Sequence, residues 1–198
     1  MIQLIDTSTL REKRLAMAAA FGWPNATDAL PINLPNHFRT QIELAIQLLP
    51  VHEAVRFVCE CAERVLDRWE ILFSSDPRPR RALEAACLWL EGVGTSESLE
   101  SARRGASDAG IEKDDTSTLP EDHPELTAAL YAAHAASHSA LAAQEASMSR
   151  WPNHQFPLGL CGAIGHGARF STHAARDEKA EMQWQKSRLA ELLMQEDG

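Results

Sequence analysis

The sequence feature that most limits the possible folds is an apolar stripe between residues 51 and 72. Its members alternate steps of four and three along the chain: Val51, Val55, Val58, Ala62, Val65, Trp69 and Leu72. These steps follow the 3.6-residue repeat of an α-helix and place the apolar side chains on one face. Charged residues such as Glu53 and Glu60 lie off that face. The pattern predicts one continuous amphipathic helix that buries one side against other helices.

Helical signals continue through the rest of the 198-residue chain. Thr9 and Glu12 fit a capping box, and Gly22 can end the helix that it opens. Further helices are predicted over about 36–49, 77–90, 95–110, 125–149 and 158–195, the last of them bent near Gly165 and Gly167. No convincing alternation of apolar and polar residues indicates a strand. We therefore predict an all-α fold, a single-domain multi-helix bundle over residues 1–198 with mostly antiparallel neighbours.

The charge balance limits the function classes. The chain has 28 acidic and 19 basic side chains, a formal net charge of -9. A general nucleic-acid-binding protein needs a basic face, so we expect no direct contact with nucleic acid. No signal peptide and no run of about 18 apolar residues is visible, which predicts a cytoplasmic protein without a membrane span. No P-loop or GxGxxG motif occurs, so no cofactor is expected.

Residues 111–124 are polar, acidic and proline-bearing, which predicts an exposed mobile loop. Because burying unpaired carboxylates is costly, this loop should stay in solvent and attract a basic partner. Trp151 lies in another predicted loop and could anchor a partner, since tryptophan is enriched at binding hot spots. The candidate partner surface consists of Glu112, Asp114, Asp115, Glu121, Asp122 and Trp151.

The stretch "SSDPRPRRALEAACLWLEG" at 74–92 places arginines at the start of a predicted helix, where the helix dipole disfavours cations. Asp76 can cap this helix by accepting from the N–H of Arg78, although a residue before proline avoids the helical region and Pro79 could be the first helical residue. Acidic partners for the arginines could come from the preceding helix or from Glu84. Arginine suits bidentate carboxylate pairing, so we favour internal ion pairs over a bound anion. The candidate residues, as a structural clamp or a binding site, are Asp76, Arg78, Arg80, Arg81 and Glu84. Arg80 is expected to be largely buried.

Histidines offer a second kind of site. His134 and His138 lie one helical turn apart, and His166 and His173 lie two turns apart. If their helices pack together, four imidazoles could converge and bind a metal ion. No HExxH or Glu-x-x-His signature accompanies them, so we favour core histidines without a metal.

Four cysteines complete the set of reactive side chains. Cys59 and Cys61 are too close in sequence for a CxxC pair, and Cys87 and Cys161 are isolated. We interpret all four as reduced and mostly buried.

Two sequence blocks resemble a known family. "CAERVL" at 61–66, followed by "DPRPRRALEAACLWLEG" at 76–92, is similar to the signature of an immunity protein family of bacterial polymorphic-toxin systems, in which a D-x-R-P-R turn precedes a helix ending in tryptophan and glycine. The matching positions are Asp76, Arg78, Pro79, Arg80, Ala82, Glu84, Ala85, Trp89 and Gly92. A looser likeness extends over 160–193. The resemblance implies an all-helical protein that neutralises a cognate toxin.

The sequence supports two functions of different classes. The first is a non-enzymatic protein-binding module, resembling an immunity protein, with a basic toxin domain as its partner. The alternative is a helical metal-dependent enzyme that uses His134, His138, His166 and His173. The first interpretation is favoured, because no catalytic motif supports the second.

Overall fold

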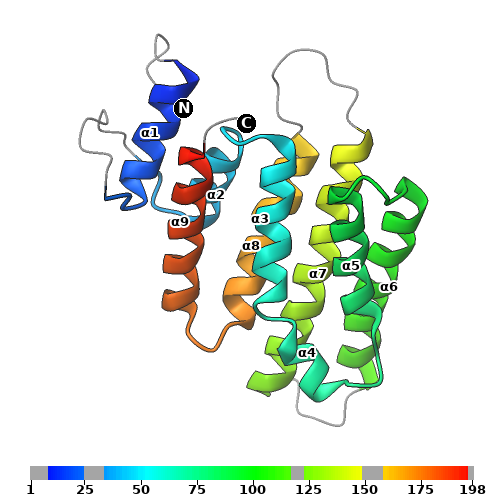
Figure 1. Ribbon diagram of the computed structural model, residues 1–198. Helices are drawn as coiled ribbons and strands as arrows, with labels where there is room; N and C mark the ends of the chain where they lie inside the picture. The colour runs from blue at the N-terminus through cyan, green and yellow to red at the C-terminus, as the bar shows by residue number, and fades with distance from the viewer. Residues whose placement is uncertain (1–8, 25–33, 117–122, 149–157, 196–198) are drawn as a thin grey trace.

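The computed structural model describes residues 9–24, 34–116, 123–148 and 158–195. Every regular element in these ranges is a helix, which confirms the predicted all-α fold (Figure 1). The helices are α1 (Leu10–Ala20), α2 (Phe38–Ile46), α3 (Val51–Glu63), α4 (Asp67–Leu72), α5 (Arg78–Leu90), α6 (Ser96–Thr116), α7 (Pro124–Met148), α8 (Leu158–Ala174) and α9 (Glu178–Met194). Within the described ranges, none of these helices is both long and apolar enough to cross a membrane.

Helix α7 is the centre of the bundle. It packs against α3, α4, α5, α6 and α8 (Figure 1). Small side chains line its buried surface: Ala129, Ala132, Ala133, Ala135, Ala136, Ser137, Ser139, Ala140, Ala142 and Ala143. Such side chains let neighbouring helices approach closely on several sides, which accounts for a helix that is apolar around most of its circumference. The predicted helix over 125–149 is confirmed to within one residue at each end.

The outer layer of the bundle is built from the first two helices and the last. Helix α1 packs on α9, and α2 packs on α8 and α9. The predicted capping box of α1 is present, because the Thr9 N–H donates to Glu12 at 2.6 Å and the Glu12 N–H donates back to the Thr9 hydroxyl at 3.3 Å. Gly22 ends this helix with a φ of 88°, a conformation that costs glycine little.

The predicted continuous helix over 51–72 is wrong in one respect, since it is divided into α3 and α4. At residues 64–66 the backbone tightens, with the Val65 N–H donating to the Ala62 carbonyl, three residues back, at 3.1 Å. Val65 and Leu66 are both buried at this turn. The break therefore keeps the apolar stripe in the core while it changes the direction of the chain.

The predicted single helix over 158–195, bent near Gly165 and Gly167, is wrong in its continuity. Helix α8 runs through both glycines, and the chain breaks later, before α9, where the Asp177 carboxylate caps the N–H groups of Lys179 and Ala180 at 3.0 Å. Gly167 serves close packing instead, because a side chain there would overlap Val58 of α3.

The predicted mobile loop over 111–124 is contradicted over most of its described length. Helix α6 does not end at Gly110 but continues to Thr116, and α7 begins at Pro124. Residues 117–122 lie outside the described ranges. The acidic segment up to residue 116 is therefore part of a helix, where polar side chains can remain exposed without a loop.

Candidate functional site

Residues 73–80, called the arginine turn from here on, join α4 to the first turn of α5 and contact the end of α6. The Arg78 guanidinium forms a two-pronged contact with Asp76, with Nε to Oδ1 at 2.9 Å and Nη2 to Oδ2 at 2.7 Å. Its Nη2 also donates to Glu112 Oε2 at 2.6 Å. The predicted bond from the Arg78 backbone N–H to the Asp76 carboxylate is present at 3.2 Å, but the predicted N-cap is wrong, since α5 begins at Arg78 and Pro77 is its N-cap residue. Hydrogen bonding from Arg78 lowers the pKa of both Asp76 and Glu112.

Arg80 connects the same turn to α3 and α4. Its Nε donates to Glu70 Oε1 at 2.7 Å, and its Nη1 contacts both carboxylate oxygens of Glu63 at 2.7 and 2.9 Å. The predicted pairing with an acid of the preceding helix is confirmed for Glu63, and the side chain, expected to be largely buried, is partly buried with 32% of its surface exposed. Glu84 and Arg81 are exposed, and neither forms an ion pair with another described residue.

Trp69 holds the arginine turn in place from the protein core. This side chain is fully buried, and its indole N–H donates to the Asp76 carbonyl at 2.8 Å. Phe73 packs against it with ring centroids 4.7 Å apart. Carboxylates around Arg78 and Arg80 thus offset the repulsion between these cations and the start of α5. Both arginines already have partners, so the geometry agrees with internal ion pairs.

A groove of about 410 Å³ lies between α3 and α5. We call it the α3/α5 groove, and its lining residues are Arg56, Cys59, Glu60, Glu63, Leu83, Cys87, Leu90 and Glu91. Leucine and cysteine side chains supply its apolar surface, and one arginine and three glutamates supply its charge. The groove therefore combines apolar contact area with a net acidic lining.

The acidic residues of the groove differ in their pairing. Glu60 receives two hydrogen bonds from Arg188 of α9, at 2.6 and 2.7 Å, and Glu63 is held by Arg80. Glu91 is exposed and forms no ion pair within the described chain. It is therefore the groove carboxylate most available to a cation from a partner.

The end of the groove is shaped by the C-terminus of α5. Gly92 has a φ of 78°, and the Val93 N–H donates to the Leu88 carbonyl at 2.9 Å, which completes a glycine-based helix end. Trp89 stacks on His52 of α3 with centroids 4.8 Å apart. Leu88 and Val93 remain 47% and 69% exposed, so this helix end adds apolar surface beside the groove.

Three of the four candidate histidines meet around Phe170. The rings of His134, His138 and His166 lie 5.2–6.0 Å from that ring, centroid to centroid. His138 and His166 stack on each other at 5.5 Å. His173 lies apart, against Tyr131 at 5.2 Å. The predicted convergence of the two helices is thus found, with an aromatic ring at its centre.

Burial makes these imidazoles weak bases. Burial, together with smaller effects of the neighbouring His166 and His134, lowers the pKa of His138 to about 4. Burial also lowers the pKa of His134 and His166. Among the described residues, no group of three or more His, Cys, Asp or Glu side chains is placed to hold a metal ion. The arrangement fits neutral aromatic packing.

The predicted acidic partner surface is only partly within the structure. Glu112, Asp114 and Asp115 are exposed on the last turns of α6, and Glu112 is engaged by Arg78. Glu121, Asp122 and Trp151 lie outside the described residues. The charged surface that can be located is therefore helical and tied to the arginine turn.

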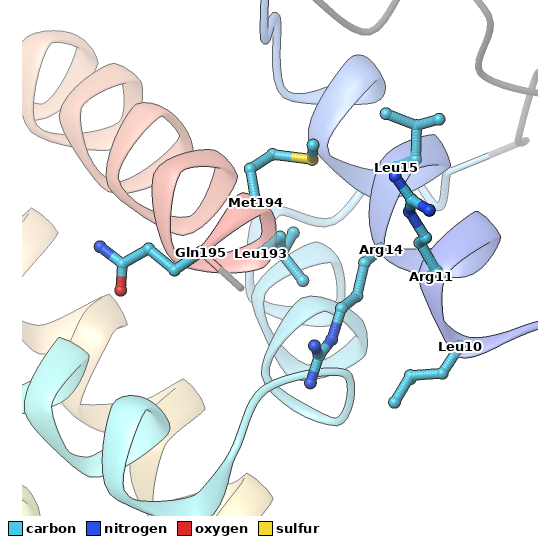
Figure 2. Close-up of a pocket in the computed structure, with 7 residues that line it drawn as sticks. All are labelled: Leu10, Arg11, Arg14, Leu15, Leu193, Met194 and Gln195. Carbon is cyan, nitrogen blue, oxygen red and sulfur yellow. The ribbon is translucent and has the colours of Figure 1, made fainter. Parts of the chain in front are cut away.

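A further pocket of about 600 Å³ lies between the start of α1 and the end of α9. Figure 2 shows its lining residues, which are Leu10, Arg11, Arg14, Leu15, Leu193, Met194 and Gln195. Arg14 extends from α1 toward the chain after α2, where its Nε donates to the Leu48 carbonyl at 2.6 Å (Figure 2). This bond connects α1 to the turn before α3.

Sequence reasoning missed a buried polar network between α8 and α9. The fully buried Gln185 donates through its amide to the Ala168 carbonyl at 3.0 Å and to the Ser171 hydroxyl at 2.8 Å. The nearly buried Glu181 accepts from Gln185 at 3.1 Å and pairs with Arg64, the C-cap residue of α3, at 2.9 Å. No spacing in the sequence marks this network, because its members come from three separate helices.

The fold and the groove define an all-helical protein with a mixed apolar and acidic surface between two helices. In comparisons with family models, with curated proteins and with solved structures, no match to this chain was found. The chain is therefore interpreted from its own residues and geometry.

Proposed function

We propose that this chain is a non-enzymatic protein-binding module that occupies a basic protein domain, in the manner of an immunity protein against a toxin. The observation that carries the proposal is the α3/α5 groove, where Leu83 and Leu90 lie beside the available carboxylate of Glu91. Such a surface suits a partner segment that presents a lysine or arginine next to an apolar side chain.

The charge of the chain supports a cationic partner. A net charge of -9 attracts a basic protein over a distance and speeds encounter, and the exposed Asp114 and Asp115 add to this field. Apolar contacts buried in the groove would then set the lifetime of the complex. The two properties act on different rate constants, so they can be tested separately.

The sequence resemblance points to the same region. Its first block falls on α3, on α5 and on the turns between them, and its Trp89 and Gly92 lie next to the groove residues Leu90 and Glu91 in the chain. The proposed surface and the family-like motif therefore share two helices, although the motif residues themselves are engaged mostly in holding the turn.

A test uses as the probe a basic toxin domain, if one is encoded by a gene next to that of this chain. Coexpression with that domain should restore growth, and purified proteins should bind each other. Leu90→Asp and Glu91→Arg should weaken binding by about tenfold or more, as expected when a hot-spot contact of about 1.4 kcal/mol is lost. Glu97→Arg, at an exposed position of α6, is the matched control for charge.

The possible outcomes test the immunity role and the location of the binding surface separately. Failure of coexpression to restore growth, together with no binding of the wild-type chain, would refute the immunity role. Protection that survives both groove substitutions would place the binding surface elsewhere. A slower association after Glu112→Gln, Asp114→Asn and Asp115→Asn, with an unchanged dissociation rate, would support steering by the acidic end of α6.

A further inference from the structure

Two cysteines from different helices meet in the α3/α5 groove. Cys59 of α3 is 4% exposed, whereas Cys87 of α5 is exposed, and both line the groove. Their thiols are hydrogen-bonded to each other. The prediction that the cysteines are mostly buried holds for Cys59, Cys61 and Cys161 but is wrong for Cys87. An exposed thiol backed by a buried one is the arrangement of an attacking and a resolving cysteine.

We propose that Cys59 and Cys87 form a reversible thiol–disulfide site, in which a low-molecular-weight disulfide drives a cross-link between α3 and α5. The proposal rests on the contact between the two thiols and not on the proposed binding function. Both side chains line the same groove between two packed helices and their thiols interact, and a disulfide would bring the two sulfurs to about 2.05 Å.

The environment assigns different roles to the two sulfurs. The hydrogen bond from Cys59 lowers the pKa of Cys87 to about 7, while the same contact and burial raise the pKa of Cys59 well above its usual range. Near neutral pH a large fraction of Cys87 is therefore thiolate, the form that attacks disulfides. Cys59 keeps its proton until it is needed for the second step.

The chemistry proceeds in two balanced steps. The Cys87 thiolate attacks one sulfur of the small disulfide, forms a mixed disulfide and releases the other half as a thiolate. Cys59 then loses its proton to solvent and attacks the Cys87 sulfur, which forms the Cys59–Cys87 bond and expels the second half as a thiolate. Two protein thiols are oxidised, one small disulfide is reduced to two thiols, and the two thiolates take up protons from solvent.

The other two cysteines are placed differently. Cys61 is fully buried and its thiol is hydrogen-bonded to Ser171, and Cys161 is buried on α8.

Glu63 and Glu91 line the groove around Cys87, so a neutral or cationic disulfide should react faster than an anionic one. This order distinguishes attack in the groove from attack by a thiol elsewhere.

The test treats the reduced, folded chain with excess 2-hydroxyethyl disulfide, which is neutral, and follows intact mass with time. The mass should first rise by one adduct and then fall to two hydrogen atoms below the starting value. Peptide mapping should locate a Cys59–Cys87 bond, and dithiothreitol should reverse it. Cystamine, which is cationic, should react faster than oxidised glutathione, which is anionic.

Single cysteine-to-alanine variants test the role of each thiol. Cys59→Ala should stop at a stable adduct on Cys87, Cys87→Ala should form no adduct on the same time scale, and Cys161→Ala should behave as wild type. A wild-type chain that keeps its Cys87 adduct, or that forms a disulfide with another cysteine, would overturn the proposal. If Cys59→Ala does not fold, the wild-type time course and the peptide map still distinguish these outcomes.

Discussion

The cluster of histidines around Phe170 should make the protein sensitive to acid, and His138 is the residue to change. Its pKa is lowered to about 4 by burial and by His166 and His134. Arg103 of α6 and Arg39 of α2 act in the same direction. In the unfolded chain the pKa of histidine returns to about 6.5. Between pH 6.5 and 4 the unfolded chain therefore binds more protons than the folded chain.

The direction and size of the effect follow from this difference. The contribution of neutral His138 to the free energy of unfolding is fully present above pH 6.5. It is lost as the pH falls toward 4, and below pH 4 this histidine causes no further loss. A difference of about 2.5 pKa units at about 1.36 kcal/mol each gives a loss of about 3 kcal/mol. Partial exposure of the ring makes this an upper value.

The informative variant is His138→Phe, because it keeps an aromatic ring beside Phe170 and removes the titrating group. The Nδ1 atom of His138 is buried without a hydrogen-bond partner in the described chain, so no hydrogen bond through that atom is lost. Urea unfolding followed by tryptophan fluorescence at pH 7.0, 5.5 and 4.5 gives the free energies of unfolding. The variant should lose up to about 2 kcal/mol less than wild type over this range, because pH 4.5 is still above the folded pKa of about 4. Equal losses in both proteins would refute the reasoning, and His37→Gln, at an exposed position, should leave the wild-type profile unchanged.

Three further predictions concern the arginine turn and the end of α5. Trp69→Phe removes the hydrogen bond to the Asp76 carbonyl and should lower the free energy of unfolding by about 1–3 kcal/mol, as measured by urea unfolding. Arg80→Leu should cost only about 1 kcal/mol, because its ion pairs are partly exposed, and Arg81→Leu should cost less; a loss of 3 kcal/mol or more at Arg80 would contradict the observed exposure. Gly92→Ala should cost about 1–2 kcal/mol from its positive φ alone, because an added Cβ would meet no atom within 4 Å, and a thermal midpoint equal to wild type would contradict this.

The sequence identified the helices more reliably than their ends. Apolar spacing located the residues of α3, α4 and α7, but it could not detect the turn at 64–66, because Val65 and Leu66 stay in the core through that turn. Proline and acidic residues at 111–124 predicted a loop, yet the chain remains helical through residue 116, where exposed carboxylates cost a helix little.

The candidate site was predictable only in its local part. The hydrogen bond from the Arg78 N–H to Asp76 follows from neighbouring residues, and it was predicted, although the N-cap residue of α5 is Pro77. The bond from Trp69 and the contact between Cys59 and Cys87 depend on how helices pack, and no sequence spacing encodes that packing. Glu84 was a candidate partner for Arg80 at a favourable helical spacing, but the guanidinium reaches Glu63 and Glu70 instead.

The arrangement of helices also has a consequence for synthesis on the ribosome. Helix α1 is made before α9 but packs on it, and α2 packs on the later helices α8 and α9. Helices α3 to α6 are likewise made before α7, the helix that packs against all four of them. The growing chain must therefore present apolar helix faces to its surroundings until the last helices have emerged. Such a chain benefits from slow release or from a holding chaperone, and premature termination before α7 should yield an insoluble product.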